Sequence, residues 1–156
     1  MKKETQSIIQ NLENTLSGEP WFGRAVYDLL NDTDETKVYV KPGGTEHSLV
    51  EILYHMITWA EFTLSRIDEN STGTLSTAEE MDWREINPAV HTWQAGMDEL
   101  KAVHKKIIDI LKTKDDSFLS GIVEERDYNY RFLLNGLIQH NIYHAGQIAY
   151  LKKMLA

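Results

Sequence analysis

Two histidines late in the chain, His140 and His144, are spaced so that both can reach one metal ion. They stand four residues apart in the segment 139–148 (QHNIYHAGQI). On an α-helix, residues four apart lie one turn above each other on the same face. Two histidines at this spacing also occur in zinc-binding helices. The pair therefore predicts a metal site if a further ligand faces it from another part of the chain.

His55 is the candidate for that further ligand. At about 100° per residue, His140 and His144 fall within an arc of roughly 80° together with apolar residues, namely Leu133, Leu137, Ile148 and Leu151. On an earlier predicted helix, His55 shares a narrow arc with Ile52, Trp59 and Phe62. Three inward-facing imidazoles that leave one coordination position open are the ligand set of a catalytic zinc-type site.

The alternative is that each histidine is an ordinary core residue in a metal-free bundle. Burying three neutral imidazoles costs free energy unless every ring finds a hydrogen-bonding partner, whereas a single metal ion satisfies three nitrogens together. We therefore expect His55, His140 and His144 to bind a metal. The chain has no cysteine, so the ligands must be nitrogen and oxygen atoms.

Other polar residues near these positions allow more than one interpretation. Gln147 lies at the edge of the histidine arc, where it either hydrogen-bonds a ligand or fills core volume. His104 lies on the inward stripe of the third predicted helix, either as a fourth ligand or in a core or proton-relay role. Asp82 and Trp83, in the loop before that helix, either rim a pocket or pack. His47 and His91 are predicted at the surface. Tyr143 is expected to pack against other residues or to lie at an interface, and the four tryptophans are predicted in the core.

Four long segments with helical periodicity predict an all-α, up-and-down four-helix bundle that forms one domain over residues 1–156. The first helix is expected from Lys3 to Leu30, broken at residues 17–20 and resuming with Pro20 in its first turn. The others are expected at about 48–70, at 88–112 with Asn87 as N-cap, and at about 127–155, with a polar loop at 71–77. Residues 38–40 alternate like a strand, but the Pro-Gly-Gly that follows ends it too early for a sheet.

Composition excludes several classes of function. The net charge of −8 makes nucleic acid an unfavourable partner, because phosphate contacts dominate such binding. No stretch is long enough to span a bilayer and the first residues lack the apolar segment of a secretion signal, so we expect a cytoplasmic protein. The di-iron Glu-x-x-His pattern, the HExxH protease motif, the GxSxG elbow and glycine-rich phosphate loops are absent.

The chain resembles the DinB/YfiT-like family of four-helix-bundle metalloproteins over essentially its whole length. The resemblance is carried by His55 in the segment 48–59 (SLVEILYHMITW) and by His140 and His144 in the segment 140–148 (HNIYHAGQI). The segment 18–23 (GEPWFG) and the Asp82-Trp83 loop support it. The resemblance implies one divalent metal per chain, most often nickel or zinc, held by these three histidines, and it implies a homodimer.

Characterised members of that family include S-transferases that use low-molecular-weight thiols such as bacillithiol, and a mycothiol-dependent maleylpyruvate isomerase. We therefore expect a metal-dependent thiol S-transferase or hydrolase-like enzyme that acts on a small molecule. The metal would lower the pKa of a bound thiol or water and so supply a nucleophile near neutral pH. The rival hypothesis is a stress-response or binding module without catalysis, in which the metal mainly joins two helices.

Overall fold

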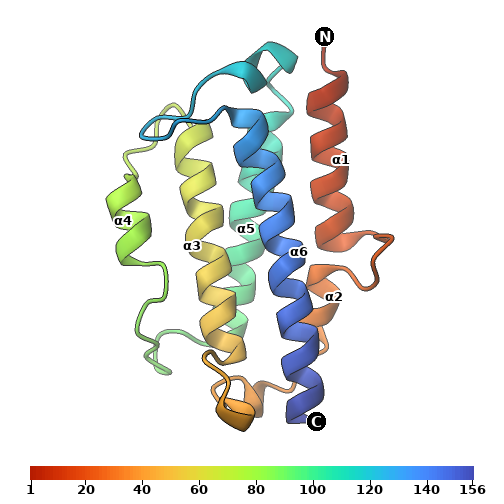
Figure 1. The fold of residues 1–156 in the computed structure, drawn as a ribbon, viewed down its shortest axis with the longest axis vertical. Coiled ribbons are helices and arrows are strands. Elements are labelled where there is room, and N and C mark those ends of the chain that lie inside the picture. The colour runs from red at the N-terminus through yellow and green to blue at the C-terminus, as the bar shows by residue number, and fades with distance from the viewer.

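The computed structural model describes residues 1–156, and every regular element in it is a helix (Figure 1). The long helices are α1 (Lys3–Ser17), α3 (Leu49–Ile67), α5 (Trp93–Leu111) and α6 (Tyr130–Leu155). The connections contain the short helices α2 (Val26–Asn31) and α4 (Leu75–Glu80) and three 3-10 turns, η1 (Glu35–Lys37), η2 (Pro42–Gly44) and η3 (Asp116–Ser120). The predicted all-α bundle is confirmed, and residues 38–40 form no strand.

The direction of the long helices divides them into two parallel pairs, α1 with α6 and α3 with α5, which run opposite ways (Figure 1). Glu4 in the first turn of α1 forms an ion pair with Arg131 in the first turn of α6. Near the start of α3, the hydroxyl of Tyr54 donates a hydrogen bond of 2.9 Å to the carbonyl of Thr92, the N-cap of α5. Successive long helices therefore alternate in direction except between α3 and α5.

A long connection makes the parallel arrangement of α3 and α5 achievable. Residues 68–92, which we call the crossover, leave the end of α3, return along the outside of that helix and reach the start of α5 (Figure 1). The crossover contains α4, which packs against α3. A strictly alternating bundle would need only a short loop at this point. The crossover instead carries Asp82 and Trp83 across the face of α3.

The side chains that cap the helices explain where the predicted boundaries need correction. The third long helix begins at Trp93 rather than at Pro88, because Thr92 is its N-cap and accepts a hydrogen bond from the backbone N–H of Ala95 at 3.2 Å. Asn87 instead caps a single isolated turn, in which its side chain accepts from the N–H of Ala89. Residues 75–80, part of which was expected as loop, form α4, and α3 ends at Ile67 rather than near residue 70.

The predicted continuation of the first helix through Trp21 is wrong. α1 ends at Ser17, where the Asn14 carbonyl accepts the N–H of Gly18 and its side chain accepts the N–H of Glu19. The chain then turns, and α2 begins only at Val26. Trp21 is fully exposed instead of lying in the core. α2 packs against α6 beyond the end of α1, so α1 and α2 together cover one side of the bundle (Figure 1).

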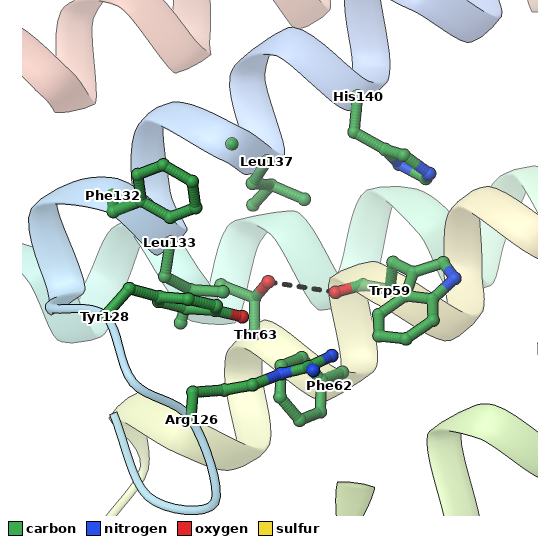
Figure 2. Close-up of a pocket in the computed structure, with 10 residues that line it drawn as sticks. Trp59, Phe62, Thr63, Arg126, Tyr128, Phe132, Leu133, Leu137 and His140 are labelled. Carbon is green, nitrogen blue, oxygen red and sulfur yellow. Dashed lines mark hydrogen bonds between the residues drawn. The ribbon is translucent and has the colours of Figure 1, made fainter. Parts of the chain in front are cut away.

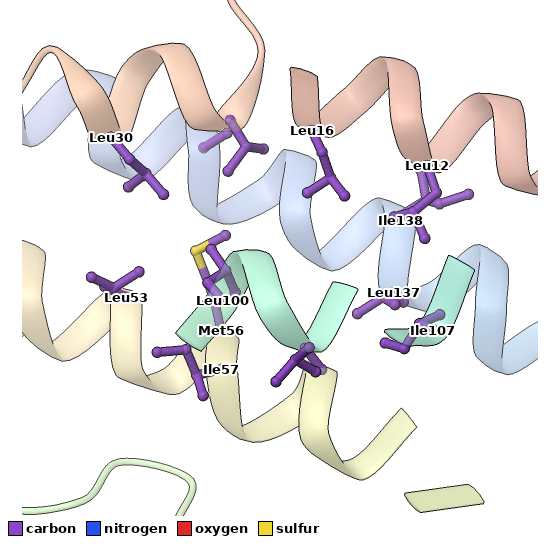
Figure 3. Packing of buried hydrophobic residues seen from close by; sticks show 14 of the residues in the cluster. Leu12, Leu16, Leu30, Leu53, Met56, Ile57, Leu100, Ile107, Leu137 and Ile138 are labelled. Atoms are coloured by element: carbon purple, nitrogen blue, oxygen red, sulfur yellow. The ribbon is translucent and has the colours of Figure 1, made fainter. Parts of the chain in front are cut away.

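The core lies between the four long helices and is filled mainly by leucine and isoleucine (Figure 3). Leu53 and Ile57 from α3 meet Leu100 from α5 with no exposed surface on any of the three. Full burial of such a side chain contributes about 1.5–3 kcal/mol. Gly96 lets α3 and α5 approach closely, because a Cβ there would lie 2.7 Å from Leu53 Cδ2. This packing fixes the helix on which His55 sits.

Candidate metal centre

Two well-capped helices hold the three predicted histidines. At the start of α3, Ser48 and Glu51 form a capping box in which Glu51 Oε2 accepts the N–H of Ser48 at 2.7 Å. His55 follows two turns later and is 7% exposed. Asn129 caps α6 by accepting the N–H of Phe132 at 2.9 Å. His140 and His144 lie in the middle of this 26-residue helix, where neither end frays.

The structure brings the Nε2 atoms of the three histidines together. His140 Nε2 lies 3.0 Å from His55 Nε2 and 3.1 Å from His144 Nε2. One ligating nitrogen from each ring lies within 4.8 Å of the other two. His55 and His144 are buried and His140 is partly exposed. Residues that are 85 positions apart in the sequence thus form one cluster across the interface of α3 and α6.

Hydrogen bonds on the outer nitrogens determine where the protons of two rings lie. His55 Nδ1 is 2.8 Å from Asp82 Oδ1 and 3.1 Å from the Asp82 carbonyl oxygen, and both of these atoms are acceptors. His144 Nδ1 is 2.6 Å from Gln147 Oε1. Each Nδ1 therefore carries the hydrogen in the neutral ring, and each Nε2 presents a lone pair. Both lone pairs point toward His140 Nε2.

This donor set fits a metal ion better than it fits a purely internal hydrogen-bond network. His140 Nε2 can donate a hydrogen to only one of its two neighbours, and its buried Nδ1 has no partner in the protein. Three nitrogens bound tetrahedrally at about 2.0–2.1 Å from one metal would lie about 3.3 Å apart, close to the spacing observed here. One cation would satisfy all three lone pairs. The residues present therefore fit a divalent metal with one position left for another ligand.

The pKa values of the cluster favour neutral imidazoles. Burial, together with the neighbouring His144 and His55, lowers the pKa of His140 to about 3. Burial also lowers the pKa of His144 to about 4, against the opposing effect of the Gln147 hydrogen bond. The pKa of His55 is lowered by burial, although Asp82 opposes the shift. Neutral rings are the form that binds a metal.

The crossover supplies the residues that cover the cluster on the α3 side. Asp82 Oδ1 accepts a hydrogen bond from Trp59 Nε1 at 2.7 Å as well as contacting His55. The indole of Trp83 stacks flat on the His55 ring, with centroids 3.9 Å apart and planes 5° from parallel. Trp83 also stacks on the His47 ring, with the two centroids 3.6 Å apart. Asp82 and Trp83 therefore position His55.

The remaining histidines lie outside the cluster. His104 is fully buried, and its Nδ1 donates to the Leu100 carbonyl at 2.9 Å while its Nε2 accepts from Asn141 Nδ2 at 2.9 Å. Both ring nitrogens are thus satisfied in the core, which corresponds to the core role rather than to a fourth ligand. Burial lowers the pKa of His104 to about 4. His91 is partly exposed and accepts the N–H of Asn87 through Nδ1.

Sequence reasoning missed two residues at this site. Trp83, expected in the core or at the rim of a pocket, is 41% exposed and stacks on the His55 ring. His47 was expected at the surface but is only partly exposed and stacks against Trp83. Neither contact follows from helical phase, because both residues lie outside the long helices. The one available signal was that Asp82 and Trp83 form an acidic-aromatic pair inside an otherwise polar connection.

A pocket of about 270 Å³ opens beside His140, between α3 and the start of α6 (Figure 2). Most of its lining is aromatic or aliphatic, and His140 closes one end. The volume lies near the lower limit for small-molecule sites in proteins. A small ligand in this pocket would lie next to the histidine cluster. The arrangement thus combines three metal-type ligands with an adjacent apolar binding space.

The fold and this site define a helical-bundle protein in which three histidines from two helices could hold a metal ion. The family model of the DinB superfamily matches residues 22–148, which is well over half of the chain. The protein belongs to the DinB superfamily, and the resemblance noted in its sequence is confirmed. No curated protein matches the chain. None of its helices combines the length and apolar character needed to cross a membrane.

Proposed function

We propose that this protein is a metal-dependent enzyme in which His55, His140 and His144 hold one divalent metal, nickel or zinc. The reaction is transfer of a low-molecular-weight thiol to a small molecule, or a related hydrolysis. The observation that carries this proposal is the convergence of the three Nε2 atoms beside an open pocket. A purely structural metal site is usually closed by four protein ligands, and only three are present here.

The chain's own residues set up the chemistry in three ways. Asp82 and Gln147 fix the orientation of His55 and His144 by accepting their Nδ1 hydrogens. Trp83 covers one face of His55 and limits access of water from that side. The pocket beside His140 gives a small molecule access to the cluster. When bound, a divalent metal would lower the pKa of a coordinated thiol or water to near neutrality.

Metal content provides the first test. Protein made without a polyhistidine tag should contain about one divalent metal per chain by elemental analysis. His140→Ala should lose that metal, whereas His91→Ala, which removes a histidine outside the cluster, should keep it. Circular dichroism would check that both variants remain helical. Absence of metal in the parent protein even after incubation with zinc or nickel would refute the proposal.

Turnover provides the second test. The parent protein would be screened with reduced low-molecular-weight thiols against small electrophiles, and with small esters and amides for hydrolysis. His140→Ala should abolish any activity found while leaving the fold intact, and His91→Ala should retain it. A metal-loaded parent protein that turns over none of these substrates would contradict the enzymatic part of the proposal.

One observation favours the non-catalytic alternative, namely that the cluster joins α3 to α6. In that case the metal would mainly hold two helices of the bundle together. Loss of the fold in His140→Ala, combined with no turnover in the parent protein, would support this second function. The two functions also differ at the pocket, because a structural site has no need of an adjacent cavity beside His140.

The same proposal includes a homodimer and a cytoplasmic location. Reduced low-molecular-weight thiols are maintained in the cytoplasm, where such a cosubstrate would be available.

Exposed aromatic residues on one side of α6, Tyr143 and Tyr150, offer a surface on which a second copy of the chain could pack. Light scattering coupled to gel filtration would give the mass in solution, and a monomer at all concentrations would refute the dimer.

A further inference from the structure

The pocket beside His140 contains one cation, Arg126. This arginine lies in the loop between η3 and α6, and its side chain extends between the aromatic rings of the pocket (Figure 2). Its guanidinium carbon is 5.5 Å from the ring centroid of Phe62 and 5.8 Å from that of Tyr128. Arginine commonly stacks on aromatic faces in this way, which leaves the edge of the guanidinium free to donate hydrogen bonds.

Arg126 has no counterion in the protein. Its Nε is buried and has no hydrogen-bond partner. Among the acidic residues close to it in the sequence, Glu124 and Glu125 form ion pairs with Arg66, and the adjacent Asp127 forms no ion pair with it. A buried or half-buried polar group without a partner costs free energy, and the cost is larger when the group is charged. A ligand that hydrogen-bonds to the guanidinium would offset this cost.

The loop holds Arg126 in place before any ligand arrives. Glu125 has a φ of 63°, which places a non-glycine residue in the left-handed region. The Glu125 carboxylate is fixed at Oε1, which accepts from Arg66 at 3.0 Å and from the backbone N–H of Leu75 at 3.2 Å. These contacts stabilise the turn immediately before Arg126. The chain therefore maintains a strained backbone that directs an unpaired cation into the pocket.

We infer that the pocket binds a small monocarboxylate with an aromatic or short apolar body. The carboxylate pairs with Arg126, since guanidinium and carboxylate form two parallel charge-assisted hydrogen bonds. The apolar body lies against the aromatic walls, and the other end of the ligand faces His140 (Figure 2). A single cation in a largely apolar lining balances one negative charge, which favours a carboxylate over a phosphate ester with nearly two charges.

The assignment of this carboxylate as the substrate rests on the proposed function. The binding of the carboxylate to the pocket does not depend on that function. Binding involves Arg126 and the aromatic walls, whereas the proposed metal involves the three histidines. Loss of metal would therefore remove the proposed enzymatic role and leave the carboxylate selectivity of the pocket in place. The two proposals can fail separately.

The test compares an acid with its neutral counterpart. Phenylacetate and phenylacetamide would be titrated into the protein, with quenching of Trp59, which lines the pocket, as the readout and calorimetry as confirmation. The acid should bind roughly 10- to 100-fold more tightly than the amide, because a hydrogen bond to a charged group contributes about 1.5–3 kcal/mol. Equal affinities for the two compounds in the parent protein would overturn the inference.

Two variants locate the selectivity. Arg126→Met keeps the apolar stem and should bring the affinity for the acid down to that for the amide. Lys106→Met, which removes an exposed cation on α5, should leave both affinities unchanged. Arg126→Lys keeps the charge without the planar fork and should give an intermediate affinity. Acid binding that survives Arg126→Met but disappears with a chelator would show a carboxylate bound to the metal and would also overturn the inference.

Discussion

The carboxylate of Asp82 lies 2.8 Å from Nδ1 of His55, although the two residues belong to different elements and are 27 positions apart. The same oxygen accepts a hydrogen bond from Trp59, so the carboxylate is held from two directions. A carboxylate behind a metal-binding histidine fixes the tautomer of the ring and makes the ligand more basic. Asp82 is therefore the residue outside the histidine cluster whose loss should affect metal binding most directly.

Asp82→Asn should weaken metal binding by roughly 10- to 100-fold without unfolding the protein. The Asp82 carbonyl still accepts from Nδ1, so the ring keeps its orientation in part but loses the charged acceptor. Competition with a chromogenic chelator would measure the affinity. The control is Asp127→Asn, an exposed acidic residue outside the cluster, which should bind as the parent does. Unchanged affinity in Asp82→Asn would assign the carboxylate a purely structural role.

Removal of the metal should lower the stability of the bundle. The metal binds only the folded arrangement of α3 and α6, so at a free concentration about 100 times its dissociation constant it adds about 2.7 kcal/mol to the free energy of unfolding. Urea unfolding with added zinc and with a chelator would measure the difference. His144→Ala should remove the response to zinc, whereas His91→Ala should keep it. A response of equal size in both variants would place the bound metal elsewhere.

The stability of the protein should fall in mild acid partly because of His104. Burial lowers its pKa from 6.5 to about 4, so the unfolded chain takes up the proton first as the pH falls. The stabilising contribution of the neutral ring is therefore complete above about pH 6.5 and is lost progressively down to about pH 4, by roughly 3 kcal/mol in total. Between about pH 7.5 and pH 5, the loss should be roughly 2 kcal/mol.

Urea unfolding of the parent and of His104→Leu at these two pH values would measure this effect. The variant is expected to be less stable overall, because Asn141 loses its partner. Its stability should nevertheless change less with pH than that of the parent. The informative quantity is the difference between the two pH values, and equal differences in both proteins would rule out a contribution from His104.

Two glycines should respond oppositely to substitution by alanine. At Gly96, a Cβ would lie 2.7 Å from Leu53 Cδ2 and 3.0 Å from the Tyr54 ring, so Gly96→Ala should destabilise the protein by about 1–3 kcal/mol. At Gly146, in the exposed face of α6, a Cβ would meet nothing within 4 Å. Gly146→Ala should stabilise by about 0.5–1 kcal/mol, since glycine is a poor helix former. Thermal unfolding of the two variants would show the opposite signs.

The part of the site that lies on long helices is predictable from the sequence. The phase of His140 relative to His144 depends only on their spacing within one helix, and the apolar neighbours of His55 show which side of its helix faces inward. The pairing of the two helices then follows from the limited ways in which four helices pack. This is why three residues spread over more than half of the chain can be assigned to one cluster without coordinates.

The crossover is not predictable in the same way. Asn87-Pro88 and Thr92 are both good helix starts locally, and the choice between them depends on tertiary contacts such as that of Tyr54 with the Thr92 carbonyl. The stacking of Trp83 on His55 depends on the path of the whole connection past α3. Arg126 likewise has no sequence signature, because its lack of a counterion appears only once Glu124 and Glu125 are seen to contact Arg66.

The placement of Asp82 and Trp83 on the crossover links metal exchange to local unfolding. α4 contributes only Ala78 to a small second cluster of buried residues and nothing to the main core. A segment with so few buried contacts opens at a lower free energy than the long helices beneath it. Amide hydrogens of residues 75–86 should therefore exchange faster than those of α3. The rate at which metal leaves the protein would then follow this local opening equilibrium and would be largely independent of the global stability of the bundle.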